Sequence, residues 1–95
     1  MKSKENTLKQ AIDSFIDYYK LRYKFDEKNI TDSWEEIAGS MINKHTTNLY
    51  LDQNKLHVEL RSSVAKQELL FIKSRLIHLI NRKLNKMVVD EIIVH

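Results

Sequence analysis

The spacing of apolar residues changes once within the stretch from Lys55 to Leu84. In its first part apolar residues take every second position, which is the period of a half-buried strand. After Ser62 and Ser63 they recur every three or four residues, at Ala65, Leu69, Ile72, Leu76 and Ile80. A serine hydroxyl at this boundary can cap the first turn of a helix. The pattern therefore predicts a strand that passes directly into a helix of about six turns.

The residues before this helix predict a β-hairpin. Segments 47–51 and 56–60 both alternate, and the polar residues 52–54 separate them as a short turn. The face expected to meet the core carries Leu49, Leu51, Leu56, Val58 and Leu60. The opposite face carries Asn48, Tyr50, His57, Glu59 and Arg61. The long helix is expected to end near Asn85, because asparagine tolerates the left-handed conformation, and segment 87–94 predicts a last strand.

Helical spacing also dominates the N-terminal part. Thr7 is a candidate N-cap for a first helix, whose apolar stripe consists of Leu8, Ile12, Phe15, Ile16 and Tyr19. The charged segment 24–29 predicts a connection, with Phe25 in the core. Thr31 is expected to cap a second helix, whose apolar face consists of Ile30, Trp34, Ile37, Ala38 and Met41. Gly39 lies inside this helix at a cost of about 1 kcal/mol relative to alanine, so we expect another backbone to approach it closely.

These elements give the order α-α-β-β-α-β, which predicts an α+β fold with a three-stranded sheet packed against helices. The 95 residues suffice for one domain, expected over residues 7–95 after a frayed N-terminus at 1–6. No cysteine is present, so disulfides, thiolate zinc sites and cysteine nucleophiles are excluded. This composition fits the cytoplasm, and neither a signal peptide nor a membrane span is expected.

Charge is distributed unevenly along the chain. Residues 1–52 contain 8 Lys/Arg and 9 Asp/Glu, whereas residues 53–95 contain 8 and 4. A basic C-terminal half indicates an acidic partner, most simply a nucleic-acid backbone, although excess lysine also serves solubility.

The long helix carries much of this charge opposite its core stripe. One row contains Phe71, Arg75, His78, Arg82 and Lys86, with Lys66 and Lys73 flanking it. Cations neutralise phosphates, and an exposed ring can stack on an unpaired base. The alternative is a solvated cationic face on which Phe71 covers a neighbouring element.

The outer sheet face, with Tyr50, His57 and Arg61, is a second candidate surface, although ordinary polar decoration explains it better. His45, His57, His78 and His95 lack metal-binding spacing, and no nucleophile elbow or phosphate-binding glycine loop occurs. We therefore expect neither an enzyme nor a metal or other cofactor.

Several short motifs, taken in order, resemble the bacterial DciA family, first described as a domain of unknown function. They are Trp34-Glu35-Glu36-Ile37-Ala38-Gly39, Lys44-His45-Thr46, Lys55-Leu56-His57-Val58-Glu59-Leu60, Ser62-Ser63, Gln67-Glu68-Leu69 and Asn81. The resemblance covers about residues 8–94. It departs from the family at Val64, where many members have an aromatic residue, and it contains no Gly-x-x-Gly loop of the kind that true RNA-binding KH domains use.

The resemblance implies a fold similar to a type II KH domain and a role in DNA replication, in loading the replicative DNA helicase. It implies two partners, the helicase and DNA, the latter single-stranded or forked. For DNA contact we select Lys44, Arg61, Lys66, Lys73, Arg75, Arg82 and Lys86. For protein contact we select Tyr50, Phe71 and His78. Many members continue past the position of His95 as a flexible basic tail. If that tail contributes to DNA or helicase contact, a chain ending here is expected to bind more weakly or to need another protein.

A second hypothesis is a protein-interaction module without nucleic-acid affinity, present as a monomer or a weak dimer. Phe71, Tyr50 and the strand at 87–94 would then supply the contact, because an exposed edge strand can pair with a partner strand or with its own copy.

Overall fold

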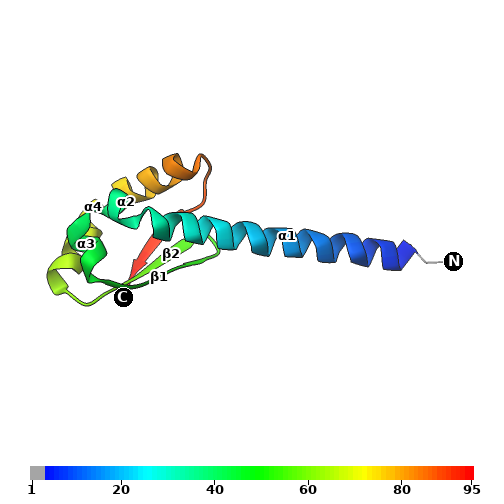
Figure 1. The fold of residues 1–95 in the computed structure, drawn as a ribbon, viewed down its shortest axis with the longest axis horizontal. Coiled ribbons are helices and arrows are strands. Elements are labelled where there is room, and N and C mark those ends of the chain that lie inside the picture. The colour runs from blue at the N-terminus through cyan, green and yellow to red at the C-terminus, as the bar shows by residue number, and fades with distance from the viewer. Residues whose placement is uncertain (1–3) are drawn as a thin grey trace.

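The computed structural model describes residues 4–95 (Figure 1). Its elements are α1 (Lys4–Asp32), α2 (Trp34–Ala38), α3 (Ser40–His45), β1 (Thr46–Asp52), β2 (Lys55–Leu60), α4 (Ser63–Leu84) and β3 (Glu91–Val94). The predicted α+β class and the order of elements are confirmed, with the second helix divided into α2 and α3. Residues 1–3 of the segment expected to fray lie outside the described part of the chain.

The three strands form one sheet in the order β1-β2-β3. β1 and β2 pair antiparallel, with Leu51 opposite Leu56, whereas β3 runs parallel to β2. A parallel pair needs a crossover, and α4 supplies it. β3 is shorter than predicted, because the amides of Val88 and Val89 donate to the Asn81 side chain instead of joining the sheet.

Both predicted ends of α4 are confirmed. The Ser62 side chain accepts a hydrogen bond from the Ala65 amide at 3.2 Å, which satisfies one of the open N–H groups of the first turn. Asn85 has φ 57° and ψ 35°, the left-handed conformation that ends a helix. The buried face between these ends contains Ala65, Leu69, Leu76 and Ile80.

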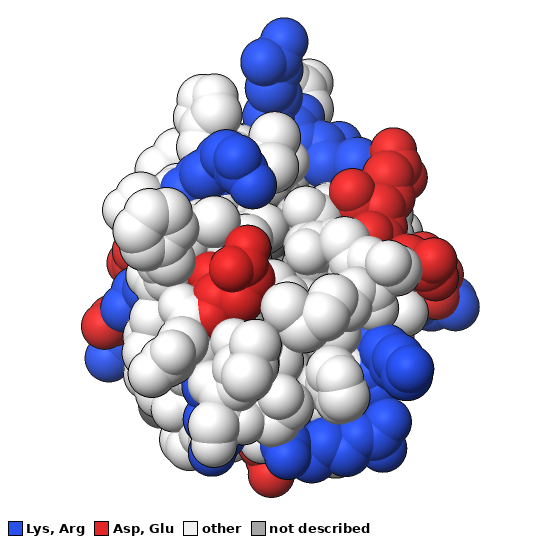
Figure 2. All heavy atoms as spheres, turned by 90° about the vertical axis from the view of Figure 1, so that its left-hand side faces the viewer, with Lys and Arg blue, Asp and Glu red and all other residues white. Residues whose placement is uncertain are grey.

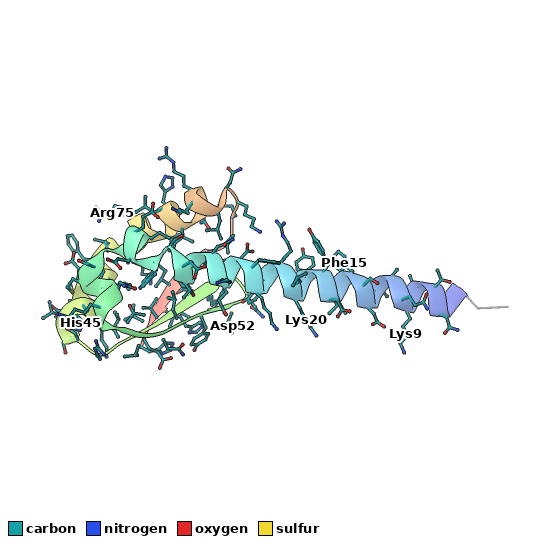
Figure 3. The ribbon with its side chains drawn as sticks, in the orientation of Figure 1. Lys9, Phe15, Lys20, His45, Asp52 and Arg75 are labelled. Atoms are coloured by element: carbon teal, nitrogen blue, oxygen red, sulfur yellow. The ribbon has the colours of Figure 1, made fainter. Side chains whose placement is uncertain are left out.

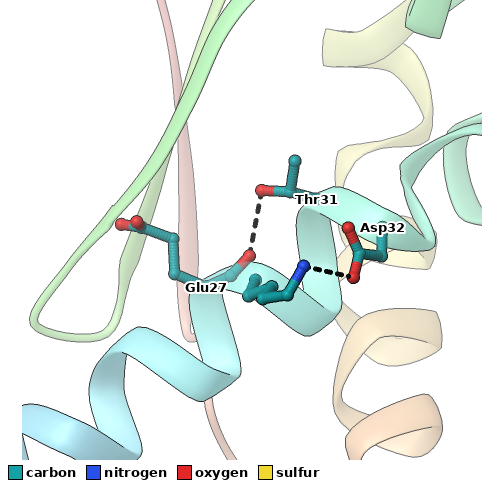
Figure 4. Close-up of polar contacts among 4 residues, drawn as sticks. Glu27, Thr31 and Asp32 are labelled. Atoms are coloured by element: carbon teal, nitrogen blue, oxygen red, sulfur yellow. Dashed lines mark hydrogen bonds and ion pairs between the residues drawn. The ribbon is translucent and has the colours of Figure 1, made fainter.

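The connection predicted at 24–29 is wrong, because α1 continues through it to Asp32. The segment has no proline or glycine, and its charged side chains are good helix formers. Phe25 is 55% exposed instead of buried. Thr31 does not cap a helix; its hydroxyl donates to the Glu27 carbonyl one turn earlier, at 2.9 Å (Figure 4). Thr7 lies inside α1 and does not cap it either.

The expected close approach at Gly39 is also wrong. A Cβ atom at this position would meet nothing within 4 Å. Gly39 instead has φ 93° and ψ 161°, a conformation that only glycine adopts easily, and it separates α2 from α3. The break turns Met41 outward, where it is 38% exposed.

The N-terminal half of α1 extends well beyond the rest of the molecule (Figure 1). The longest dimension is 64 Å, against 24 and 19 Å for the other two. Near the other end of α1, Ile30 is fully buried and Tyr23 packs against the core. The apolar stripe predicted for the first helix is therefore present, but it has no core to cover.

Candidate nucleic-acid and partner interface

The outward row of α4 consists of exposed side chains. Phe71 is 89% exposed, and Arg75, His78 and Arg82 follow it on the same side of the helix (Figure 3 labels Arg75). Among the side chains of residues 6–95, neither arginine forms an ion pair. Two guanidinium groups about two turns apart are thus available to phosphate oxygens.

Lys66 and Lys73 occupy a different side of α4. They are half-buried, and Lys73 lies only two residues before Arg75, so the two side chains point in different directions. The fold therefore does not bring all the selected cations of α4 into one row.

Lys86 is turned away from the helix row. It lies beyond Asn85, where the chain reverses, and its ammonium group pairs with the Asp26 carboxylate at 2.9 Å. This ion pair joins the α4–β3 connection to α1. Lys86 is half-buried, so its charge is already partly neutralised by a neighbour.

Lys44 and Arg61 meet where α3, β1 and β2 come together. The Arg61 guanidinium donates to the Lys44 carbonyl at 2.7 Å, and the Arg61 amide donates to the His45 carbonyl at 3.1 Å. Both side chains remain exposed. Figure 2, which looks onto the end of the molecule opposite the free end of α1, shows basic side chains in separate groups with uncharged and acidic surface between them.

On the outer sheet face, three rings stack across the sheet. Tyr50 and His57 are nearly parallel, with centroids 4.6 Å apart, and His57 and His95 follow at 5.1 Å. The Nδ1 atom of His57 and the Nε2 atom of His95 are 2.9 Å apart and share a hydrogen bond. Sequence reasoning missed His95, because only the parallel pairing of β3 with β2 brings it beside His57. Since the rings cover one another, their faces are mostly not free to stack on a base.

The structure also shows hollows that the sequence did not indicate. One of about 540 Å³ lies between α1 and the end of α4, and its lining includes Arg22, Lys83 and Lys86. Lys83 pairs with Glu36 of α2 at 2.7 Å. Arg22 and Lys83 were not selected because they come from helices whose relative position the sequence does not give.

Two motif residues hold the fold together. The Trp34 indole N–H donates to the Thr46 hydroxyl at 3.0 Å, and that hydroxyl donates to the Ile42 carbonyl at 2.7 Å. Asn81 binds the α4–β3 connection: its Oδ1 accepts from the Val88 and Val89 amides, and its Nδ2 donates to the Val89 carbonyl. Both side chains thus provide hydrogen-bond partners for polar groups that the fold removes from water.

Where side chains are described, at residues 6–95, no three His, Asp or Glu side chains gather closely enough to bind a metal ion. No helix there combines the length and the hydropathy needed to cross a bilayer.

A family model described as "Dna[CI] antecedent, DciA" matches residues 7–94, nearly the whole chain. Comparisons with curated proteins and with solved structures gave no match.

Proposed function

We propose that this chain, which belongs to the DciA family, is a non-enzymatic replication accessory protein that binds the replicative DNA helicase and DNA and assists helicase loading. The observation that carries this proposal is the match over residues 7–94. The residues that give the chain its resemblance to the family, such as Trp34 and Asn81, hold the fold through hydrogen bonds. The match therefore concerns the whole fold. A cytoplasmic location follows from this role.

The exposed cations support DNA contact. Arg75 and Arg82 are exposed and have no ion-pair partner among the described side chains of residues 6–95. Lys44 and Arg61 form a second group at the start of the sheet. Phosphate neutralisation releases condensed counterions, so binding by such groups weakens as salt rises. We assign a secondary role in DNA binding to three half-buried lysines, Lys66, Lys73 and Lys86.

The exposed ring on α4 supports protein contact. Phe71 is 89% exposed, and His78 lies about two turns further along the same side of α4. A large aromatic side chain is a frequent anchor of protein interfaces. We propose that both residues contact the helicase, with Tyr50 contributing from the sheet.

The test is a DNA-binding titration over a salt series with Arg75→Glu/Arg82→Glu. Lys9→Glu/Lys24→Glu is the matched control, because it makes the same change in charge on the polar side of α1. Loss of two phosphate contacts should flatten the slope of log K against log salt by roughly 1.5 to 2. The control should retain most of its affinity. Equal weakening of both variants would show that overall charge, and not the α4 row, determines binding.

Helicase binding is measured separately, by pull-down with the replicative helicase at low and high salt, with and without single-stranded DNA. Complex formation that survives high salt without DNA, and that Phe71→Ala weakens, supports direct docking. If the chain captures helicase only through DNA at low salt, the helicase part of the proposal fails. If the chain binds helicase but no DNA, the alternative of a protein-interaction module without nucleic-acid affinity is correct.

A further inference from the structure

The projecting half of α1 carries a continuous row of exposed apolar side chains. We call this row the free apolar stripe; it consists of Leu8, Ile12, Phe15, Ile16 and Tyr19. These side chains are between 43% and 63% exposed, and the rings of Phe15 and Tyr19 contact each other with centroids 4.9 Å apart. An apolar row of this length on a water-exposed helix indicates a surface that another molecule covers.

The free apolar stripe continues the face by which α1 packs on its own domain. Tyr23 and Ile30 lie on the same side of the helix as Tyr19, and both pack against the core. Figure 3 shows Phe15 on one side of α1, with Lys9 and Lys20 on the opposite side. An apolar row therefore runs along the whole of α1, but the domain covers only its second half. Tyr18, Leu21 and Phe25 are also exposed, on other sides of the helix.

We propose that the free apolar stripe pairs with the same stripe of a second copy of this chain, with the two α1 helices antiparallel. With about 100 Å² of apolar surface on each of five side chains, two copies bury on the order of 1,000 Å², the size at which specific interfaces begin. Residues 8–20 contain two lysines and two aspartates, so the paired segments carry no net charge. Such a segment does not repel its copy, and it does not attract a nucleic acid.

The spacing of the stripe fits this orientation. The intervals from Leu8 through Ile12 and Phe15 to Tyr19 are four, three and four residues, which read the same in both directions. In an antiparallel pair Leu8 of one copy therefore lies level with Tyr19 of the other, and Ile12 lies level with Phe15. All four layers are then apolar.

The position of the domain excludes the parallel alternative. Each domain sits on the apolar side of its own α1, at the C-terminal end. If two helices paired in parallel through this side, both domains would occupy the same space between them. In an antiparallel pair the domains lie at opposite ends of the paired segment.

A hollow at the edge of the domain can receive the end of the second helix. It measures about 490 Å³, and its lining includes Tyr19, Tyr23, Leu51 and Met87. Met87 is 81% exposed. With Leu8 of the second copy level with Tyr19, that leucine lies at the rim of this hollow, where Tyr23 and Met87 extend the apolar surface that it meets.

The test is sedimentation velocity of the full chain over a concentration series, with Ile12→Glu/Phe15→Glu as the disrupting variant. Glutamate keeps helix propensity and sets like charges opposite one another in the proposed pair. Gln10→Glu/Ser14→Glu is the matched control, with the same added charge on the polar side of the same segment. We expect a concentration-dependent dimer, weakened more than about tenfold in the first variant and unchanged in the control.

A chain that stays monomeric at every concentration overturns the proposal. If the disrupting variant also loses helicase binding in that case, the stripe is a helicase surface instead. Neither result bears on DNA binding by the α4 row, which Arg75→Glu/Arg82→Glu tests separately.

Disulfide trapping tests the orientation, since the chain has no cysteine of its own. A mixture of Leu8→Cys and Tyr19→Cys proteins should form mixed disulfides under mild oxidation, whereas Leu8→Cys alone should crosslink poorly. Phe71→Cys, on α4 and outside the stripe, is the control that measures crosslinking by random collision. Efficient crosslinking of Leu8→Cys with itself would show a parallel pair and overturn the antiparallel arrangement.

Discussion

Replacing Asn81 by alanine should destabilise the fold more than any other single change at a half-buried polar side chain. Asn81 makes three hydrogen bonds of 2.7 to 2.9 Å to the α4–β3 connection. Its partners are backbone groups of Val88 and Val89, which are 6% and 1% exposed. After truncation, two amides and one carbonyl are left there without this partner.

The expected loss follows from these contacts. At about 1 kcal/mol for each hydrogen bond, three bonds contribute about 3 kcal/mol. Alanine recovers about 0.6 kcal/mol through its better helix propensity. The free energy of unfolding of Asn81→Ala should therefore fall by about 2 to 3 kcal/mol, which corresponds to roughly 10 to 20 °C in Tm for a domain of this size.

Urea denaturation of three variants checks this estimate. Asn81→Asp keeps the oxygen acceptor for both amides but loses the donor to the Val89 carbonyl, so it should lose about half as much stability. Asn29→Ala, at an exposed position of α1, is the control and should stay within about 0.5 kcal/mol of the parent chain. An Asn81→Ala protein as stable as the control would refute the role given to this side chain. Equal loss in both Asn81 variants would show that the donor, and not the acceptor, matters.

Two further predictions concern backbone strain and pH. Gly39→Ala should lower the free energy of unfolding by about 1 to 3 kcal/mol in urea denaturation, because the φ of 93° is unfavourable for alanine although no atom crowds the site. Ser40→Ala is the control and should be near neutral. Equal stability of the two variants would contradict this explanation. Burial and the carboxylates of Asp52 and Glu27 raise the pKa of the Tyr23 hydroxyl above its ordinary value of 10.0. Because the unfolded chain then loses this proton at a lower pH than the folded chain, stability falls as pH rises above 10. The Tm measured between about pH 9 and 11 should therefore fall less for Tyr23→Phe than for the parent chain. A parallel decline of the two Tm values would count against the raised pKa.

The sequence by itself determined the elements whose signals are local. The hairpin and α4 follow from the period of apolar residues. One of the two candidate serines, Ser62, begins α4 and Asn85 ends it, because capping depends on a few neighbouring backbone groups. The family resemblance also came from the sequence, because its motifs are short runs of neighbouring residues that can be recognised without the fold. Where local signals were ambiguous the prediction failed: charged segment 24–29 continues a helix, and Gly39 ends one.

Tertiary structure alone decided what each face meets. The periodicity predicted the apolar stripe of α1 correctly, but it does not say whether a core lies beneath that stripe. No core lies beneath Phe15, which is exposed. The ion pair of Lys86 with Asp26, the stacking of His57 on His95 and the hollow beside Arg22 all join residues far apart in the chain. Such contacts depend on how helices and strands pack together, because a spacing pattern records only the side on which a residue lies.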